Sequence, residues 1–198
     1  RAIALDHEML RLFQHMGVMA DIEPFTEPFT DSVYYGVDGQ IIKRMSTVAP
    51  PYPLSHRPSI VFTQPPVERV LRAHAQSFDC VTVELGQTMQ QLQQDKQGVT
   101  LTLTGDDGRA TSVRARYVIG CDGARSEVAR QAIAGADRTR YVFAYHEIIE
   151  APQNEPGHDG ARCDVYYQGD VSPDFYGWVF PHGKTMSVGT GSAHKGFS

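Results

Sequence analysis

The segment RARYVIGCDGARSEVARQ, residues 114–131, constrains the fold of this chain more than any other. The apolar run at 117–119 predicts a strand that enters the core, and a helical pattern resumes at about Ser126. Between them two glycines bracket Asp122, whereas a simple turn needs only one glycine. The segment therefore predicts a strand, a loop whose backbone lies close to a neighbour, and a helix. In α/β folds, ligands bind at the carboxyl end of such a strand.

Composition and charge exclude several classes of partner. The 198 residues are 41% hydrophobic and 21% charged, as in an ordinary globular protein with a core. A net charge of −5 offers no electrostatic attraction to nucleic acid or to an anionic membrane surface. No apolar run approaches the ~18 residues of a membrane span, and the sequence has no signal-peptide pattern. We therefore expect neither nucleic acid nor a membrane as partner, and the oligomeric state stays open.

The cysteines and histidines show no metal-binding pattern. Cys80, Cys121 and Cys163 are odd in number and lack the spacing of metal ligands, which favours free thiols in a reducing compartment. A cytoplasmic location is the expectation that follows. The eight histidines include no H-x-x-x-H pair, so no metal site is expected.

The first half of the chain alternates helices and strands. A helix is predicted over 7–16, capped by Asp6 and ended by Gly17. A strand over 59–64 leads into a helix that has Pro65 and Pro66 in its first turn, where the missing N–H costs nothing. The buried faces expected for these helices comprise Leu5, Met9, Leu12, Phe13 and Met16 in the first, and Val67, Val70, Leu71, His74, Ala75 and Phe78 in the second.

Strands dominate the second half. Residues 80–85 alternate as a strand, and residues 98–120 have the pattern of a hairpin that turns at GDDG. After the helix at 126–133, strands are predicted over 141–149, RCDVYYQ, FYGWVF and KTMSVGTG. The sequence thus predicts an α+β fold, in which an α/β layer precedes a sheet.

The loop after residue 120 carries two side chains with binding chemistry. The Asp122 carboxylate can accept hydrogen bonds from the hydroxyls of a ribose or another cofactor group, and the Arg125 guanidinium can reach a phosphate or a carboxylate. The alternative is a purely local one, in which the aspartate caps the helix and the arginine is solvated. The residues alone leave both interpretations open.

The stretch RYVIGCDGARSEVARQ resembles the D-G motif of the flavoprotein hydroxylase superfamily, the p-hydroxybenzoate hydroxylase-like group. The resemblance implies FAD as cofactor and NAD(P)H as co-substrate, with Asp122 and Gly123 close to FAD. It gives Arg125 a structural or pyridine-nucleotide role. RAIALDHEMLRLFQHMGV and IVFTQPPVERVLRAHA are similar to two further family segments, which imply that Arg1 and Gln64 contact the flavin. The local alternatives are a frayed terminal arginine and a glutamine that caps the helix.

Two branches of the superfamily share the resemblance. Residues 1 to about 126 are most similar to the 3-(3-hydroxyphenyl)propionate hydroxylases, which implies an aromatic-ring monooxygenase acting on a phenolic acid in a dry pocket. From about residue 124 the chain resembles geranylgeranyl reductase of bacteriochlorophyll synthesis, which implies a prenyl chain as substrate. The Y-x-W-x-F-P signature of that branch suggests a substrate-binding wall, with plain sheet core as the alternative: Tyr176, Trp178, Phe180 and Pro181.

Together, the residue patterns and the two resemblances predict a fold class, a division into domains and a function. The fold class is α+β, a partial FAD-binding α/β layer with an adjoining β-sheet substrate layer. Residues 1–140 form the partial FAD-binding domain, with substrate-layer strands near 30–60, and residues 141–198 form the β-sheet substrate-binding region. The function that these resemblances imply is that of an FAD-dependent oxidoreductase similar to an NAD(P)H-dependent aromatic-ring hydroxylase. The alternatives are a geranylgeranyl reductase, or an inactive remnant or chimera joined near the shared DGARS.

The sequence also sets an expectation for FAD affinity. It begins with Arg1 in place of an initiator methionine, and we expect a fragment truncated at both ends. The G-x-G-x-x-G turn that binds the pyrophosphate in this superfamily is absent, and the glycine pair in GTGS, 189–192, precedes no helical pattern. The 198-residue chain by itself is therefore expected to bind FAD weakly or not at all.

Overall fold

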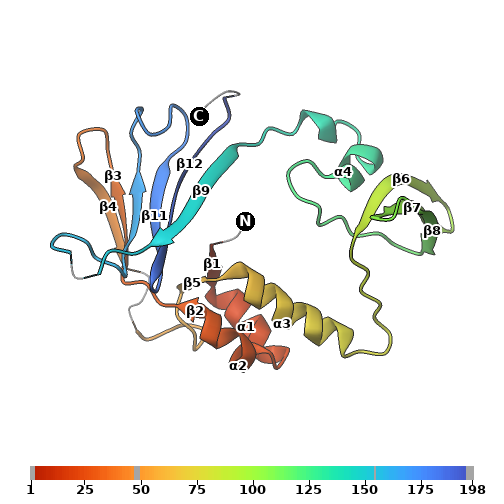
Figure 1. The fold of residues 1–198 in the computed structure, drawn as a ribbon, viewed down its shortest axis with the longest axis horizontal. Helices are drawn as coiled ribbons and strands as arrows, with labels where there is room; N and C mark the ends of the chain where they lie inside the picture. The colour runs from red at the N-terminus through yellow and green to blue at the C-terminus, as the bar shows by residue number, and fades with distance from the viewer. Residues whose placement is uncertain (1–2, 47–49, 154, 195–198) are drawn as a thin grey trace. The chain divides into compact units, whose positions relative to one another are not determined.

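The computed structural model describes residues 3–46, 50–153 and 155–194 (Figure 1). Its internal contacts divide the chain into two compact units, which we call the first unit (Arg1–Val81 with Val142–Ser198) and the second unit (Thr82–Tyr141). The boundary predicted near residue 140, between the FAD-binding domain and the substrate-binding region, concerns function and stays a prediction. By packing, the strands that follow residue 141 belong with the first 81 residues.

Helices cover a small sheet in the first unit. Strand β5 (Ser59–Phe62) pairs antiparallel with β1 (Ala4–Asp6) on one side and with β2 (Thr26–Glu27) on the other. The helices are α1 (His7–His15), α2 (Met19–Ile22), the 3₁₀ turn η1 (Glu23–Phe25) and α3 (Gln64–Gln76). Their shared core consists of Leu5, Leu10, Phe13, Val18, Ile22, Ile60, Phe62 and Val67.

Helix α1 has the ends that the sequence predicts. The Asp6 carboxylate accepts a hydrogen bond from the Met9 amide at 2.9 Å, and Gly17 adopts a left-handed φ of 77° after the last turn. Its predicted buried face is wrong in part, because the structure buries Leu10 together with Phe13. Met9, Leu12 and Met16 are exposed, since α2 and the small sheet pack against the side that Leu10 and Phe13 share.

A six-stranded sheet forms the rest of the first unit (Figure 1). Its strand order is β4-β3-β10-β11-β12-β9, in which only β3 and β10 run parallel. The strands are β3 (Asp31–Tyr35), β4 (Ile41–Ser46), β9 (Phe143–Glu150), β10 (Cys163–Tyr166), β11 (Gly177–His182) and β12 (Thr185–Ser192). The predicted strands after residue 141 are confirmed. The parallel pairing joins strands about 130 positions apart in the sequence.

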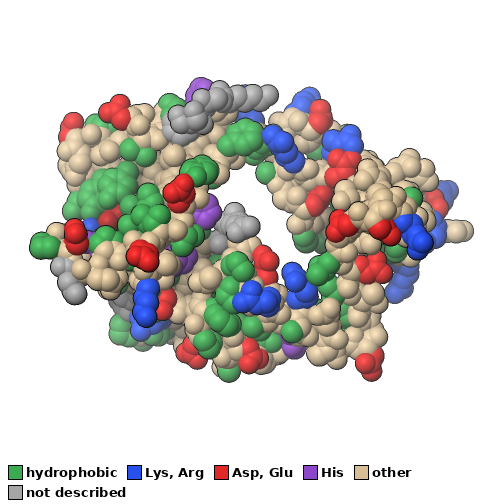
Figure 2. Space-filling view, in the orientation of Figure 1, with side chains coloured by type: hydrophobic (Ala, Val, Ile, Leu, Met, Phe, Trp, Pro, Cys, Tyr) green, Lys and Arg blue, Asp and Glu red, His purple; other side chains and the backbone are tan. Residues whose placement is uncertain are grey.

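The edge strands of this sheet expose several large apolar side chains. On the face shown in Figure 2, hydrophobic side chains gather over the strands of this sheet. The exposed ones on β4 and β9 are Ile41, Ile42, Phe143, Tyr145, Ile148 and Ile149.

The second unit is a three-stranded meander followed by short helices. Its elements are β6 (Gln87–Asp95), β7 (Gly98–Gly105), β8 (Ala110–Ala115), α4 (Glu127–Ala132) and the 3₁₀ turn η2 (Ala136–Arg138). The hairpin around GDDG and the helix after Ser126 are confirmed.

Two strand predictions in the second unit are wrong. Residues 80–85 form no strand, because β7 pairs instead with the glutamine-rich segment that follows them. The run at 117–119 is also irregular, with Tyr117 and Ile119 exposed to 82% and 86%, since β8 ends at Ala115. No described strand pairs with this run, and an apolar sequence forms a strand only where a partner supplies its hydrogen bonds.

The expected α+β class is confirmed. Within the described residues, no helix is long and apolar enough to cross a bilayer.

Candidate functional site

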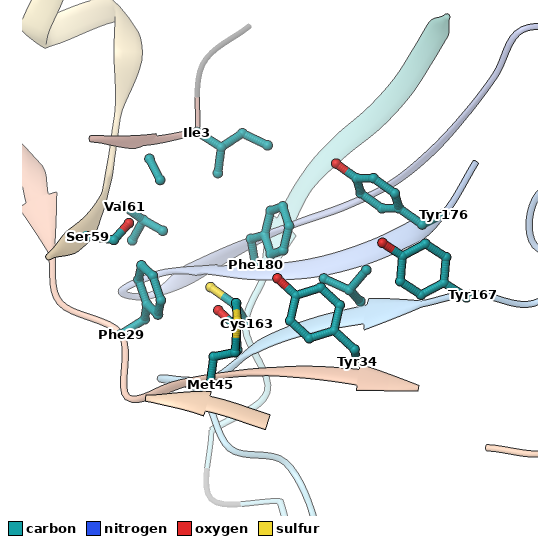
Figure 3. A pocket seen from close by; sticks show the side chains of 13 residues that line it. Ile3, Phe29, Tyr34, Met45, Ser59, Val61, Cys163, Tyr167, Tyr176 and Phe180 are labelled. Carbon is teal, nitrogen blue, oxygen red and sulfur yellow. The ribbon is translucent and has the colours of Figure 1, made fainter. Parts of the chain in front are cut away.

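A pocket of about 380 Å³ lies in the first unit, between the small sheet and one face of the six-stranded sheet (Figure 3). Strands β3, β10 and β11 supply one wall, and β1 and β5 supply the facing wall. The lining is mostly apolar and aromatic: Ile3, Ala4, Phe29, Ser32, Tyr34, Met45, Ser59, Val61, Cys163, Val165, Tyr167, Tyr176 and Phe180. Such a size and lining are typical of small-molecule sites.

The predicted aromatic row lies at this pocket. The ring centroid of Trp178 is 5.9 Å from that of Tyr176 and 6.1 Å from that of Phe180, so the three rings share one face as expected. Tyr176 and Phe180 line the pocket, whereas Trp178, only 6% exposed, lies behind them. Pro181 is buried on β11 and, by strand alternation, faces the opposite side from Phe180. Substrate contact by these residues stays a prediction.

The sheet provides a fitted position for the indole of Trp178. Its Nε1 donates to Ser187 Oγ at 3.1 Å, and His146 Nδ1 lies 3.0 Å from the same oxygen. Ser187 is fully buried, so the indole satisfies a group that water does not reach. Gly189 lies beneath the ring, and a Cβ there would stand 2.4 Å from Trp178 Cζ2. Nothing local in the sequence indicates that Ser187 and His146 lie beside the indole, whereas the glycine in GTGS is a signal for the close approach at position 189.

Three tyrosines gather at the pocket from separate segments. Tyr34 on β3 stacks with Tyr167 at 6.3 Å between centroids, and Tyr167 contacts Tyr176 edge-on at 5.8 Å (Figure 3). Burial, and then the neighbouring Tyr167, raises the pKa of both Tyr34 and Tyr176. These phenols therefore stay protonated and neutral near pH 7. Tyr34 and Tyr167 were missed because nothing local in the sequence marks them.

Gln64 has one buried oxygen without a partner. Its Nε2 donates to Glu68 Oε1 at 2.5 Å, while its Oε1 is buried and has no hydrogen-bond partner within the described part of the chain. The alternative role as a helix cap is wrong, because Thr63 occupies the N-cap position and Gln64 is the first residue of α3. An unsatisfied buried acceptor calls for a donor, which a bound molecule can supply.

Asp122 has a clear local role in the second unit. Its Oδ1 accepts from Ser126 Oγ at 2.5 Å, and its Oδ2 accepts from the amides of Glu127 and Val128 at 2.6 and 3.1 Å. The hydrogen bond from Ser126 is the largest cause of a lowered pKa for this carboxyl group. The carboxylate thus caps α4, as the local alternative predicted. Its contact with FAD stays a prediction.

Local structure also explains why glycine occupies positions 120 and 123 of the loop. A Cβ at Gly120 would stand 2.8 Å from Val128 Cβ, so the neighbour that the backbone approaches is α4. Gly123 has a left-handed φ of 83°, which other residues rarely adopt.

Arg125 lies beside Tyr141, and the two belong to a second cavity. The Arg125 Nε donates to the Tyr141 hydroxyl at 2.9 Å, and its guanidinium carbon lies 5.5 Å from the ring centroid. Both residues and Gly123 line a cavity of about 570 Å³ in the second unit. The structure thus brings Gly123 and Arg125 together in one unit and leaves Gln64 in the other. Arg1 lies outside the described residues.

The first turn of α4 is expected to loosen as the pH falls from 4.5 toward about 2. Hydrogen bonds from Arg130 and Gln131 lower the pKa of Glu127 from 4.5 to about 2, and the pKa of Asp122 is lowered too. A lowered folded-state pKa stabilises the fold above the unfolded-state pKa, and protonation removes that contribution. Amide hydrogen exchange at Glu127 and Val128, measured by NMR relative to the intrinsic rate, tests this.

The control for this experiment is the amide of Val70 in α3, whose helix has no acidic residue in its first turn. In Asp122→Ala, the Glu127 and Val128 amides should exchange faster already at neutral pH. Unchanged protection in that variant would contradict the capping role.

Comparison with known proteins places the chain in a family. Residues 1–176 match the FAD-binding domain family as one continuous stretch. The 3-(3-hydroxy-phenyl)propionate/3-hydroxycinnamic acid hydroxylase of Mycolicibacterium smegmatis is 38% identical over 168 residues, which is 82% of this chain and 29% of that protein. Geranylgeranyl diphosphate reductase of Rhodobacter capsulatus is 53% identical over 90 residues, which is 46% of this chain and 22% of that protein.

Both expected resemblances are thus confirmed, and the chain spans less than a third of the length of either relative. The hydroxylase match is longer than the 126 residues expected, and the two matched stretches overlap because together they exceed the length of the chain.

Solved structures share the fold. The flavin-dependent monooxygenase PieE, solved with FAD and substrate, has a TM-score of 0.71 at 22% identity, covering 100% of this chain and 37% of that one. The p-nitrophenol 4-monooxygenase PnpA of Pseudomonas putida DLL-E4 also has a TM-score of 0.71, at 20% identity, covering 100% of this chain and 49% of that one. The family match and the shared fold lead to one conclusion: this chain belongs to the FAD-binding domain family.

Proposed function

We propose that the chain forms part of an FAD-dependent oxidoreductase, which hydroxylates a small aromatic substrate and takes its electrons from NAD(P)H. The observation that carries this proposal is the aromatic pocket of about 380 Å³ on one face of the six-stranded sheet. The ring of a phenol is complementary to walls formed by Phe29, Tyr34 and Phe180, because aromatic rings pack favourably edge-on or offset.

One unpartnered polar atom supports the proposed contact between this chain and FAD. Gln64 Oε1 is a buried acceptor without a partner in the described part of the chain, and FAD carries N–H and hydroxyl donors on its ring and ribityl chain. In this proposal Gln64 accepts a hydrogen bond from the flavin. Asp122, Gly123 and Arg125 form a second contact region, and Arg1 a third. The cofactor supplies the redox chemistry when bound.

The residues of the pocket then have three tasks. They bind the ring, orient it and exclude water from it. The apolar side chains of Ile3, Val61 and Val165 keep the pocket dry, and a dry site favours transfer of oxygen to the substrate over loss of the oxidant to water.

Replacement of Gln64 tests the FAD contact. Gln64→Leu is expected to raise the Kd for FAD about three- to tenfold, because one hydrogen bond to the cofactor is lost. Titration of FAD into a longer protein that carries this chain, followed by flavin fluorescence, measures the change, because the 198 residues by themselves are expected to bind FAD weakly or not at all. Gln76→Leu, at the exposed end of the same helix, is the matched control and should leave the Kd unchanged. Equal affinities for Gln64→Leu and the parent would contradict the assignment.

The reaction is tested by oxygen dependence. Protein that carries this chain, supplied with FAD and NAD(P)H, should consume NAD(P)H faster when a phenol is added and should form a hydroxylated product only in the presence of oxygen. A preparation that neither binds FAD nor consumes NAD(P)H would favour an inactive remnant.

A prenyl reductase is the second candidate. It is supported by the 53% identity with geranylgeranyl diphosphate reductase over 90 residues. In that case Tyr176 and Phe180 contact the chain of an isoprenoid, with Trp178 behind them and Pro181 next to Phe180 on the same strand. Reduction of a geranylgeranyl group under anaerobic conditions, without hydroxylation of phenols, would establish this candidate over the first.

A further inference from the structure

The described side chains that line the pocket in the first unit are uncharged. Among the described residues that line it, none is an aspartate, glutamate, lysine, arginine or histidine. Its polar groups are the hydroxyls of two serines and three tyrosines and the thiol of Cys163. Burial raises the pKa of this thiol to about 12, so the sulfur stays protonated and neutral.

The three tyrosine hydroxyls are available to a ligand. No hydrogen bond joins the hydroxyl of Tyr34, Tyr167 or Tyr176 to another residue within the described ranges, although their rings contact one another. Figure 3 shows these three rings together on one side of the pocket. Each hydroxyl can donate one hydrogen bond and accept another. The three tyrosine hydroxyls can therefore donate a hydrogen bond to a ligand hydroxyl or accept one from it, and neither bond requires a charged group.

A carboxylate meets no counter-charge among the described residues that line this pocket. A phenol or alcohol that enters exchanges its hydrogen bonds to water for bonds to the tyrosines. An ionised carboxylate also loses its hydration, and no described cation of the lining compensates for the loss. The walls therefore penalise an anion relative to a neutral ligand of the same shape.

We infer that this pocket selects an uncharged hydroxyaryl ligand, bound through Tyr34, Tyr167 and Tyr176, over an arylcarboxylate of the same shape. The inference rests on the proposed function and narrows its substrate class. The inferred preference for an uncharged ligand also differs from the substrate in the names of the hydroxylase relatives, which specify an arylpropionate.

A matched pair of ligands tests the inference. The probes are 3-(3-hydroxyphenyl)propan-1-ol and 3-(3-hydroxyphenyl)propionate, which share the phenol and the chain length and differ in charge. The sequence contains a single tryptophan, Trp178, which contacts two aromatic residues of the pocket wall, so its emission reports binding to the full 198-residue chain. The alcohol is expected to bind at least about tenfold more tightly than the carboxylate.

The outcomes separate this inference from the proposed function. Equal binding, or tighter binding of the propionate, overturns the inference, while oxygen-dependent hydroxylation of either phenol still supports the proposed function. Failure of both ligands to bind, checked by calorimetry, overturns the inference and the aromatic substrate together.

Single variants identify the groups responsible. Tyr34→Phe and Tyr176→Phe keep the rings and remove one hydroxyl each, so each should weaken binding of the alcohol about three- to tenfold. Tyr166→Phe is the matched control on the opposite face of the sheet and should have no effect. Met45→Lys places an ammonium group at the pocket and should shift the preference toward the propionate. Unchanged affinity in both tyrosine variants would contradict the role of their hydroxyls.

Discussion

Gly189→Ala is expected to lower the free energy of unfolding by about 2 to 3 kcal/mol, as overpacking of a well-packed core does. A Cβ at this position would stand 2.4 Å from Trp178 Cζ2, 2.6 Å from His146 Cβ and 2.6 Å from the Tyr145 carbonyl oxygen. The indole can move aside, but the carbonyl belongs to the backbone of β9, which pairs with β12 along its whole length. Relief therefore requires a shift of the sheet itself.

Urea denaturation followed by far-UV circular dichroism measures this change, since Trp178 emission would itself be altered by the substitution. Gly169→Ala is the matched control. It lies in the same unit and has no atom within 4 Å of the added Cβ, so its stability should stay within about 0.5 kcal/mol of the parent. A Gly189→Ala chain as stable as this control would show that the indole does not lie over the glycine in solution.

Trp178→Ala is expected to cost about 3 to 5 kcal/mol, the usual range for removal of a large buried aromatic side chain. The indole is 6% exposed, contacts the rings of Tyr176 and Phe180, and donates to the buried Ser187. Its loss leaves a cavity behind the aromatic wall and removes one partner of a buried hydroxyl. In the proposed function, the wall then no longer holds the substrate ring, so KM should rise more than kcat falls.

Trp178→Phe separates packing from hydrogen bonding. It keeps an aromatic ring in the row and loses the bond to Ser187, which retains His146 as a partner, so it should cost only about 1 kcal/mol. Phe78→Ala removes a ring that is 48% exposed and serves as the control, with an expected cost below about 1 kcal/mol. Thermal unfolding measures all three variants. Equal costs for Trp178→Ala and Phe78→Ala would exclude a structural role for the indole.

Local signals predict several elements of this chain correctly. Asp6, Gly17 and the Pro65–Pro66 pair mark helix ends through interactions that span only a few residues. Helix α1 begins and ends close to the predicted positions, and α3 begins close to its predicted start. The GDDG turn likewise marks the β7–β8 hairpin. These predictions succeed because the physics that determines each feature is contained in the segment itself.

Strands that depend on a distant partner are predicted less well. The apolar segments at 80–85 and 117–119 have side chains typical of strands, yet neither finds a partner in the described structure. The strand that does form, β6, is rich in glutamine and is stabilised by its ladder to β7. Side-chain pattern alone does not show which segments obtain hydrogen bonds from a neighbour.

The candidate site shows the same division. The alternation of Tyr176, Trp178 and Phe180 along the sequence predicts three rings on one face of a strand, and the rings do contact one another. Tyr34 joins them only because β3 pairs with β10, far along the chain. Ser187 is the acceptor for the indole because β11 and β12 pair in a register that places it beside the aromatic row.

By itself, the sequence of this protein determined its family, the helix ends, the turns and the face on which the aromatic row lies, since motifs, caps and alternation act over short separations. Tertiary structure alone decided that residues 80–85 and 117–119 form no strand, that Asp122 caps α4, and that a pocket whose described lining is uncharged opens beside the row. These features join residues from separate strands or opposite ends of a loop, and the packing of the folded chain determines which of them meet.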